Sequence, residues 1–179
     1  MKTLETERLT LTAYRPEDAG DLYEYAKNPN VGPIAGWAPH KSVEESEMII
    51  RDMFMPVEAW AIRLKGQDKV IGTIALEYDK YRPESNSREI GYSLAEEHWK
   101  HGYMTEAVKA VMKFAFDELG LDQIGICTGE VNKRSQRVIE KCGFRYEGTI
   151  RRTYKVFDGT CRDSLVFSIL RDEYYELNK

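Results

Sequence analysis

The spacing of hydrophobic and polar residues changes within the segment from Arg88 to Gly120. Ile90 and Leu94 belong to a stretch that alternates with the two-residue spacing of a β-strand, and Gly91 inside it predicts a bulge or a close backbone approach to a ligand. A helical stripe then follows, and Gly120 is a favourable residue to end that helix. The stripe consists of Met104, Ala107, Val108, Val111, Met112, Ala115 and Leu119. The segment is therefore predicted to form a strand, a loop and a long helix.

The remaining patterns predict further strands and helices on both sides of this segment. Pro16 and its acidic neighbours start a helix that runs to about Lys27, and Ser42 with Glu45 forms a capping box for the next helix. The apolar positions of that second helix are Val43, Ile49, Ile50 and Met53. The predicted strands are 6–12, 59–64, 70–78, 88–94, 122–130, 145–156 and 161–170. We expect an α/β (α+β) fold with a mixed, largely antiparallel sheet of about seven strands and helices on both faces.

Composition narrows the class of protein. The chain has 179 residues, of which 42% are hydrophobic and 31% charged, so we expect one soluble domain over residues 1–179. Its N-terminus has no signal-peptide pattern and no apolar run approaches about 20 residues, which favours a cytoplasmic protein. The net charge of -4 argues against nucleic acid and membranes as partners and weakly favours an amine-bearing substrate. The spacing of the three cysteines predicts neither a disulfide framework nor a metal site.

A glycine-containing turn at residues 99–105 leads into the long helix. The first N–H groups of a helix lack partners within it, and the helix start carries about half a positive charge, so this turn suits a diphosphate. Gly102 lets the backbone approach closely, while Lys100 and His101 can add charge or donors at the rim. The alternative is that Gly102 only closes a tight turn and that both basic side chains are solvated. Neither GxxxxGK(S/T) nor GxGxxG occurs in the chain.

Two other segments contain candidate site residues. In the segment 131–144, Asn132 follows a strand and Ser135 lies at the start of a short helix that Gly143 ends. The local alternative is that Asn132 and Ser135 are only helix caps. In the loop 31–41, Trp37 and His40 are candidates to line an acceptor site, or to pack between the two N-terminal helices.

Taken together, the EIGYSL strand, the GYMTEA segment and the NKRSQRVIEKCGF segment resemble the GNAT acetyltransferase superfamily. The resemblance covers nearly the whole chain and is strongest to the protein N-terminal acetyltransferase branch of the RimJ/RimL type. It implies splayed central strands with acetyl-CoA between them. The family pattern Q/R-x-x-G-x-G/A binds the coenzyme A pyrophosphate, and its positions here are Trp99, Gly102 and Met104, of which Trp99 and Met104 depart from the pattern. Backbone N–H groups do most of that binding, so we expect the cofactor site to be retained.

The resemblance also implies roles for individual residues. The N-x-x-S pattern at Asn132 and Ser135 lies near the pantetheine arm and the sulfur, and backbone N–H groups between Tyr92 and Leu94 polarise the thioester carbonyl. The expected cofactor-binding residues are Tyr92, Ser93, Leu94, Trp99, Lys100, His101, Gly102, Tyr103, Met104, Thr105, Asn132 and Ser135.

Acyl transfer to an amine needs a neutral amine, a polarised carbonyl and a stabilised thiolate leaving group. Glu89 is the candidate base, and it also belongs to the expected substrate-binding set with Trp37 and His40. The alternatives for Glu89 are an exposed strand glutamate or one paired with an arginine. Ser135 is the candidate donor to the departing sulfur, and Asn132 completes the catalytic set. No histidine lies near Cys127 or Cys142 in sequence, which favours direct attack over a covalent route.

The acceptor is the least determined part of the prediction. An α-amine is neutral far more often than a lysine at pH 7, since the two pKa values are about 7.7–8.0 and about 10.4. A modest base such as Glu89 therefore suits a protein or peptide N-terminus. A small-molecule amine, such as a polyamine, an aminoglycoside or an amino acid derivative, and a non-catalytic acetyl-CoA sensor are the alternatives. The sequence leaves monomer and homodimer open.

Overall fold

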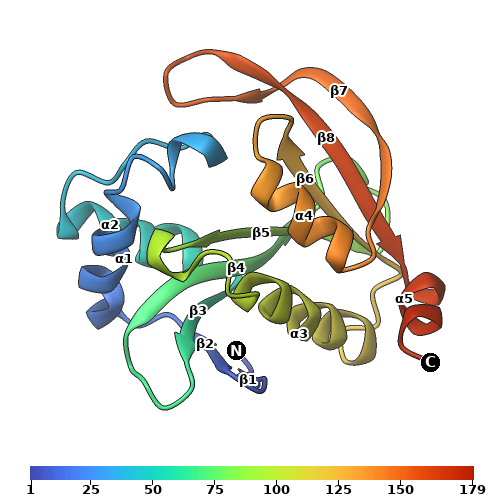
Figure 1. The fold of residues 1–179 in the computed structure, drawn as a ribbon, viewed down its shortest axis with the longest axis horizontal. Helices are drawn as coiled ribbons and strands as arrows, with labels where there is room; N and C mark the ends of the chain where they lie inside the picture. Colours follow the sequence, from blue (N-terminus) through green and yellow to red (C-terminus); the bar gives the residue numbers. More distant parts are fainter.

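The computed structural model describes all residues from Met1 to Lys179 and contains one eight-stranded sheet (Figure 1). The strand order is β1-β2-β3-β4-β5-β6-β8-β7. The strands are β1 (Leu4–Glu5), β2 (Leu9–Ala13), β3 (Glu58–Leu64), β4 (Val70–Tyr78), β5 (Ser87–Leu94), β6 (Gln123–Gly129), β7 (Arg145–Lys155) and β8 (Cys161–Leu170). The expected mixed, largely antiparallel sheet is confirmed, with one strand more than predicted.

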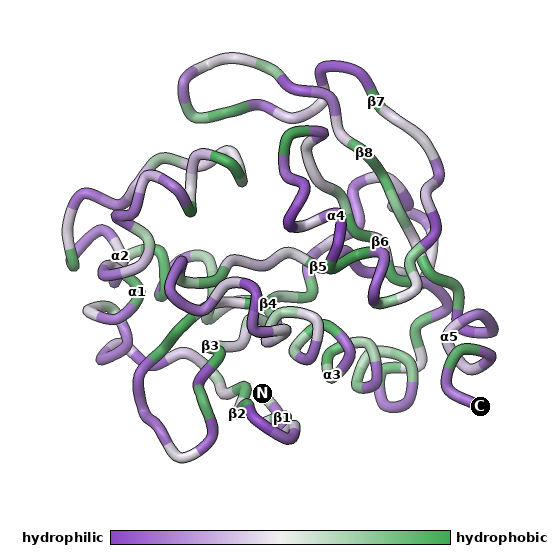
Figure 2. The backbone as a smooth tube through the Cα atoms, in the orientation of Figure 1, coloured by the Kyte–Doolittle hydropathy of each residue, from purple (hydrophilic) through white to green (hydrophobic).

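Five α-helices accompany the sheet. They are α1 (Ala19–Ala26), α2 (Val43–Ile49), α3 (Tyr103–Asp117), α4 (Lys133–Lys141) and α5 (Arg171–Leu177). Alternate residues of β3 show that helices cover both faces, because Trp60 and Ile62 belong to the core cluster under α3 and Ala61 to the cluster under α1. Figure 2 shows that the inner strand β8 is largely apolar and that the edge strand β7 is more polar. No helix is both long and apolar enough to cross a membrane.

The central strands of the sheet separate part of the way along their length. All neighbouring pairs are antiparallel except β5 and β6, which run parallel and are connected through α3. β5 pairs with β4 from Tyr78 and Arg88 through to Gly72 and Leu94, but it pairs with β6 only between Ser87 and Ile90. Beyond Ile90 the two strands therefore diverge, as the family resemblance implies.

Several local predictions were wrong. The predicted first strand at 6–12 includes a tight turn, because the Thr6 hydroxyl accepts a hydrogen bond from the Leu9 N–H at 2.8 Å, and β2 begins only at Leu9. Gly91 makes no bulge, since it pairs in register with Ala75. α3 ends at Asp117, which leaves Leu119 exposed beyond its buried stripe. Of the apolar positions predicted for the second helix, Val43 and Met53 are exposed, and only Ile50 is fully buried.

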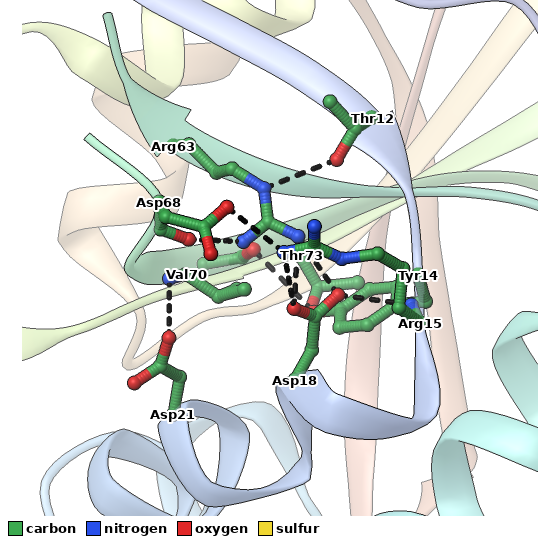
Figure 3. A network of polar contacts seen from close by, with 10 residues as sticks. Thr12, Tyr14, Arg15, Asp18, Asp21, Arg63, Asp68, Val70 and Thr73 are labelled. Atoms are coloured by element: carbon green, nitrogen blue, oxygen red, sulfur yellow. Dashed lines mark hydrogen bonds and ion pairs between the residues drawn. The ribbon is translucent and has the colours of Figure 1, made fainter. Parts of the chain in front are cut away.

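A buried ion pair attaches the start of α1 to the sheet (Figure 3). Arg63 of β3 donates to both carboxylate oxygens of Asp18 at 2.9 and 2.8 Å, and both side chains are almost fully buried. Next to this pair, the hydroxyl of Thr73 contacts the phenol groups of Tyr14 and Tyr25. These contacts fix α1 against β3 and β4, so that Tyr25 is held over the centre of the sheet.

The hairpin of β7 and β8 makes a bridge to the loop that precedes α2. The Tyr154 hydroxyl donates to the carbonyl oxygen of Ala35, the Phe157 N–H to that of Gly36 at 2.9 Å, and Arg162 to that of Pro33 at 3.1 Å. We call these contacts the hairpin bridge. It joins segments more than 100 residues apart, above the place where β5 and β6 diverge (Figure 1).

Candidate active site

The divergence of β5 and β6 exposes backbone groups in the middle of the sheet. From Gly91 to Leu94, the edge of β5 that would face β6 has no strand partner. Its N–H and C=O groups can therefore bond to an extended ligand that lies between the strands. The strand supplies directed donors at this point without any special side chain.

The start of α3 provides a second set of backbone donors. Gly102 has a φ of 82° and Lys100 a φ of 66°, so the turn uses the left-handed region twice before the helix begins. None of the backbone N–H groups from Lys100 to Thr105 donates a hydrogen bond within the chain. A helix start with free N–H groups and its positive dipole end is a seat for an anion.

These two features border a cavity of about 310 Å³, here called the cofactor cleft. The predicted residues Tyr92, Ser93, Leu94, Trp99, Lys100, Gly102, Tyr103, Met104, Thr105, Asn132 and Ser135 all line it. Trp99 is fixed there because its indole N–H donates to the Leu94 carbonyl at 2.8 Å. His101 does not line the cleft. Its ring stacks on Tyr103 with the centroids 5.6 Å apart.

The charged residues of the cofactor cleft are all basic. No carboxylate lines it, and its cations are Lys100, Arg134, Arg137 and Lys141. The last three were missed from the sequence, although their spacing of three and four residues places them on one face of α4. The Arg134 guanidinium lies 3.8 Å from the centre of the Trp99 ring, so a cation–π contact connects α4 to the α3 turn. In a chain of net charge -4, this local positive charge indicates an anionic ligand.

A second cavity, of about 510 Å³, lies on the other side of the divergence and is here called the acceptor cavity. Six residues line both cavities: Ile34, Ala35, Tyr92, Ser93, Asn132 and Ser135. The acceptor cavity contains many apolar and aromatic side chains, among them Tyr25, Trp37, Ile49, Met53, Phe54 and Tyr154. Its charged residues are three carboxylates and one lysine, namely Glu45, Glu77, Glu89 and Lys80. The two cavities therefore have opposite charge and meet beside β5.

Ser135 lies at the junction of the two cavities. Its hydroxyl is 2.9 Å from that of Tyr92, and its backbone N–H donates to the Asn132 side chain at 3.2 Å. Asn132 is thus the cap of α4, and it fixes Ser135 at the junction at the same time. Burial raises the pKa of Tyr92 well above its usual value, so its phenol stays protonated. When Tyr92 donates to Ser135, the serine proton is free to point into the junction.

Glu89 is a buried carboxylate on the floor of the acceptor cavity. Its Oε1 accepts from the Cys127 thiol at 2.7 Å and lies 3.7 Å from the Lys80 ammonium. The partner of Glu89 is therefore a lysine and not the arginine that was one of the alternatives expected from the sequence. Burial, followed by the nearby charge of Glu89, raises the pKa of Cys127 to about 12, and burial raises that of Cys142 to about 12. Neither thiol is activated as a nucleophile.

Trp37 and His40 both line the acceptor cavity. Their ring centres are 5.3 Å apart, and His40 Nδ1 lies 2.8 Å from the Ser46 hydroxyl. Burial lowers the pKa of His40, so the ring is neutral at pH 7. The structure brings both residues into the same cavity as Glu89, where they form part of the apolar wall.

A comparison with models of protein families shows to which family the chain belongs. The model of the acetyltransferase (GNAT) domain matches residues 8–145, which is more than half of the chain. The chain belongs to the GNAT acetyltransferase family. It is an acyltransferase that uses acetyl-CoA to acetylate an amine. The cofactor cleft fits this donor, since free backbone N–H groups and four cations face the space where a diphosphate would lie.

Known proteins are similar to all or part of this GNAT chain. A protein named "Uncharacterized N-acetyltransferase p20" from Bacillus licheniformis is 32% identical over 97% of this chain and 99% of its own. The "Putative ribosomal N-acetyltransferase YdaF" of Bacillus subtilis is 36% identical over 48% of this chain and 46% of its own. The crystal structure of the microcin C7 self-immunity acetyltransferase MccE in complex with acetyl-CoA and AMP has a TM-score of 0.79 at 19% identity. It covers 92% of this chain and 93% of its own.

Proposed function

We propose that this GNAT enzyme acetylates the free α-amine at the N-terminus of a peptide or protein, as enzymes of the RimJ/RimL type do. The observation that carries the proposal is the hairpin bridge. Ala35 and Tyr154, which are hydrogen-bonded to each other in the bridge, both line the acceptor cavity. One side of the cavity is therefore closed, which favours an acceptor that enters end-on, such as the free N-terminus of a peptide.

The chemistry of the cavity supports the same class of acceptor. Its net negative lining attracts an ammonium group, and its aromatic wall suits the apolar side chains that follow an N-terminus. The α-ammonium group has a pKa of about 7.7–8.0, so that a carboxylate can remove its proton near neutral pH. The name of the Bacillus subtilis relative YdaF points in the same direction.

In this proposal the roles of the residues follow from their positions. Acetyl-CoA supplies the acetyl group when it is bound in the cofactor cleft. Glu89 takes a proton from the ammonium, directly or through water, and the N–H groups of β5 beyond Gly91 bond to the thioester carbonyl. Ser135, oriented by Tyr92, donates its proton toward the departing sulfur. The basic face of α4 and the turn at Gly102 hold the phosphates.

A small primary amine with an apolar body is the second candidate. The size of the acceptor cavity, about 510 Å³, and its many apolar residues favour it, because such cavities commonly enclose small molecules.

An acceptor panel separates these candidates. The release of free coenzyme A thiol is measured with three acceptors. They are a short lysine-free peptide with a free α-amine, an Nα-blocked version of it in which one residue is replaced by lysine, and phenethylamine. We expect the first peptide to be turned over with a kcat/KM at least tenfold above the other two. Mass spectrometry should place the acetyl group on the α-nitrogen. Turnover of phenethylamine alone would favour the second candidate and contradict the first.

A further inference from the structure

The floor of the acceptor cavity is formed by paired residues of β4 and β5. Thr73 lies opposite Ser93, Ala75 opposite Gly91, and Glu77 opposite Glu89, and all six line the cavity. The four residues other than the glutamates are small and leave open space above the strands. The two glutamates place long carboxylate side chains at one end of the floor. Opposite positions in an antiparallel pair have their Cβ atoms about 4.5–5.5 Å apart, so the two carboxylates are close neighbours on one face.

The three carboxylates of the acceptor cavity differ in their partners. Glu89 is paired with Lys80 and Cys127, and Glu45 accepts a hydrogen bond from the Lys41 N–H at 2.5 Å. The Glu77 carboxylate has neither an ion pair nor a hydrogen bond within the chain, and the charge of Lys80, which pairs with Glu89, acts on it only at longer range. Its carboxyl group leans over the middle of the floor, because its carboxyl carbon is 3.6 Å from the position that a Cβ on Gly91 would take.

We propose that Glu77 is the residue that recognises the positive charge of the acceptor. The acceptor's ammonium group lies over Gly91, donates one N–H to Glu77 and presents another to Glu89. An ammonium has three donors, so it can satisfy both carboxylates and still point its third N–H away from them. Glu77 thus determines specificity, and the proton passes to Glu89.

The electrostatics of the cavity floor agree with this role. Glu77 is partly exposed, and its pKa is raised first by partial desolvation and then by the like charge of Glu89, while the charge of Lys80 acts in the opposite direction. The Glu77 anion is therefore only partly compensated. Directly opposite like charges destabilise a sheet. A cation placed between them removes that repulsion, which favours the binding of an ammonium group.

Gly91 has a clear function in this arrangement. Its missing side chain leaves the space beneath the Glu77 carboxyl open, at a point where β5 has lost its β6 partner. The glycine that the sequence marks as a close approach is therefore the place where the acceptor contacts the backbone. This inference rests on the proposed function only in that the cavity receives an amine, whichever amine that is.

Binding of charged and uncharged probes tests the inference without relying on turnover. The enzyme is saturated with coenzyme A, which carries no acetyl group, and calorimetry measures the affinity for the peptide Ala-Phe-Gly-Gly amide. The uncharged probe is its des-amino analogue, in which hydrogen replaces the α-ammonium. We expect the wild type to bind the charged peptide about tenfold more tightly, the usual worth of a hydrogen bond to a charged group.

The variants decide whether Glu77 is responsible. Glu77→Gln should reduce the preference for the charged peptide to less than about twofold and leave coenzyme A affinity unchanged, while Glu77→Asp should retain part of the preference. Glu84→Gln, which alters an exposed glutamate outside the cavity, is the matched control and should behave as wild type. An unchanged preference in Glu77→Gln overturns the inference.

A second pair of probes separates this inference from the proposed function. Phenethylamine and 2-phenylethanol repeat the comparison with a small molecule. If the peptide neither binds nor reacts but Glu77→Gln abolishes the preference for phenethylamine, the proposal of an N-terminal acceptor fails and the role of Glu77 stands. If the wild type prefers the charged member of neither pair, the role of Glu77 is contradicted, whatever the enzyme turns over.

Discussion

At the scale of single residues, Ser135 lies both at a helix start and at the place where we propose that the acetyl group is transferred. Its backbone is fixed by the Asn132 cap, and its hydroxyl lies against Tyr92 at the junction of the two cavities. A role as helix cap and a role in the proposed site are therefore compatible, because the hydrogen bond with Asn132 that starts α4 also fixes the position of Ser135.

Ser135→Ala should reduce kcat by about 10–100-fold and change acetyl-CoA affinity by less than about threefold, because a donor to a developing thiolate acts mainly in the transition state. Steady-state kinetics and calorimetry measure the two effects. Tyr92→Phe, which leaves the serine hydroxyl without its partner, should give a smaller loss of the same kind. Equal losses of turnover and affinity would show that Ser135 only binds the cofactor.

Glu89→Gln should keep the fold and the cofactor affinity but lower kcat by about 10²–10⁴-fold, the usual worth of a general base. The pH–rate profile should change as well. The variant should retain only the part of the wild-type pH dependence that belongs to the amine. Cys127→Ala, which removes only the thiol donor, is the control. A near-normal rate with an unaltered profile in Glu89→Gln would remove this residue from the mechanism.

Most residues that line the cofactor cleft could be predicted from the sequence, but the positive charge of the cleft could not. Gly102, Asn132 and Ser135 belong to short patterns with fixed spacing, and such patterns are visible without a structure. Arg137 and Lys141 face the cleft only because of the way α4 packs, which the spacing along one helix does not reveal by itself. His101 was assigned to the cleft from its neighbourhood in sequence, but the left-handed turn at Lys100 directs it to Tyr103 instead.

At the scale of elements, the start of α3 depends on one backbone conformation. Gly102 has a φ of 82° and precedes the free N–H groups that face the cofactor cleft. Elements with several periodic residues, such as α3 and β4, were predictable within about two residues. The strand β1 could not be predicted, because two residues are too few to show an alternating pattern. The turn at Thr6 could not be predicted either, because it lies within a stretch that alternates like a strand.

Gly102→Val should weaken acetyl-CoA binding by a few kcal/mol, because a β-branched residue disfavours a positive φ and its side chain would stand between the diphosphate and the N–H groups. Calorimetry with coenzyme A measures the effect. Gly66→Val is the matched control, since Gly66 has a φ of 79° in the turn between β3 and β4 and nothing surrounds its Cβ position. It should lose stability but retain affinity. Unchanged affinity in Gly102→Val would place the diphosphate elsewhere.

At the scale of the whole molecule, the hairpin bridge joins the first and last thirds of the chain across the acceptor cavity. Patterns along a sequence do not report contacts between segments so far apart, and this is why the bridge could not be predicted. Its geometry depends on Gly36, because a side chain there would collide with the Tyr154 ring.

Gly36→Ala should open the bridge and raise the KM for the peptide acceptor several-fold while leaving the KM for acetyl-CoA unchanged. Gly159→Ala is the matched control, because Gly159 also has a positive φ, of 86°, but no atoms lie near its Cβ position. The backbone strain is thus present in both variants and the collision only in one. Equal effects of the two substitutions on the acceptor KM would contradict a role for the bridge.

The buried Cys142 thiol and the partly buried Cys127 thiol should make the fold sensitive to alkali. The pKa of Cys127 and Cys142 is raised to about 12 in the folded protein, against about 8.5 in an unfolded chain. Above pH 8.5 the unfolded state loses these protons first, so the free energy of unfolding should decrease as pH rises toward 12, by up to about 1.4 kcal/mol per pH unit for each thiol. Denaturation between pH 8 and 10 measures the slope. Replacing both cysteines by alanine should flatten it, and Cys161→Ala, at an exposed thiol, should not.

The single parallel pair in the sheet has a further consequence for how such an enzyme can change. Because β5 and β6 run in the same direction, the chain must cross over through α3, and the crossover with α4 brings most of the cofactor cleft into residues 87–141. Much of the acceptor cavity comes from outside that span, from α1, the loop before α2, β4 and the hairpin. Mutations that alter the choice of amine can therefore accumulate in the flanking segments while the segment that binds the donor stays the same, so that substrate preference can evolve separately from the chemistry it uses.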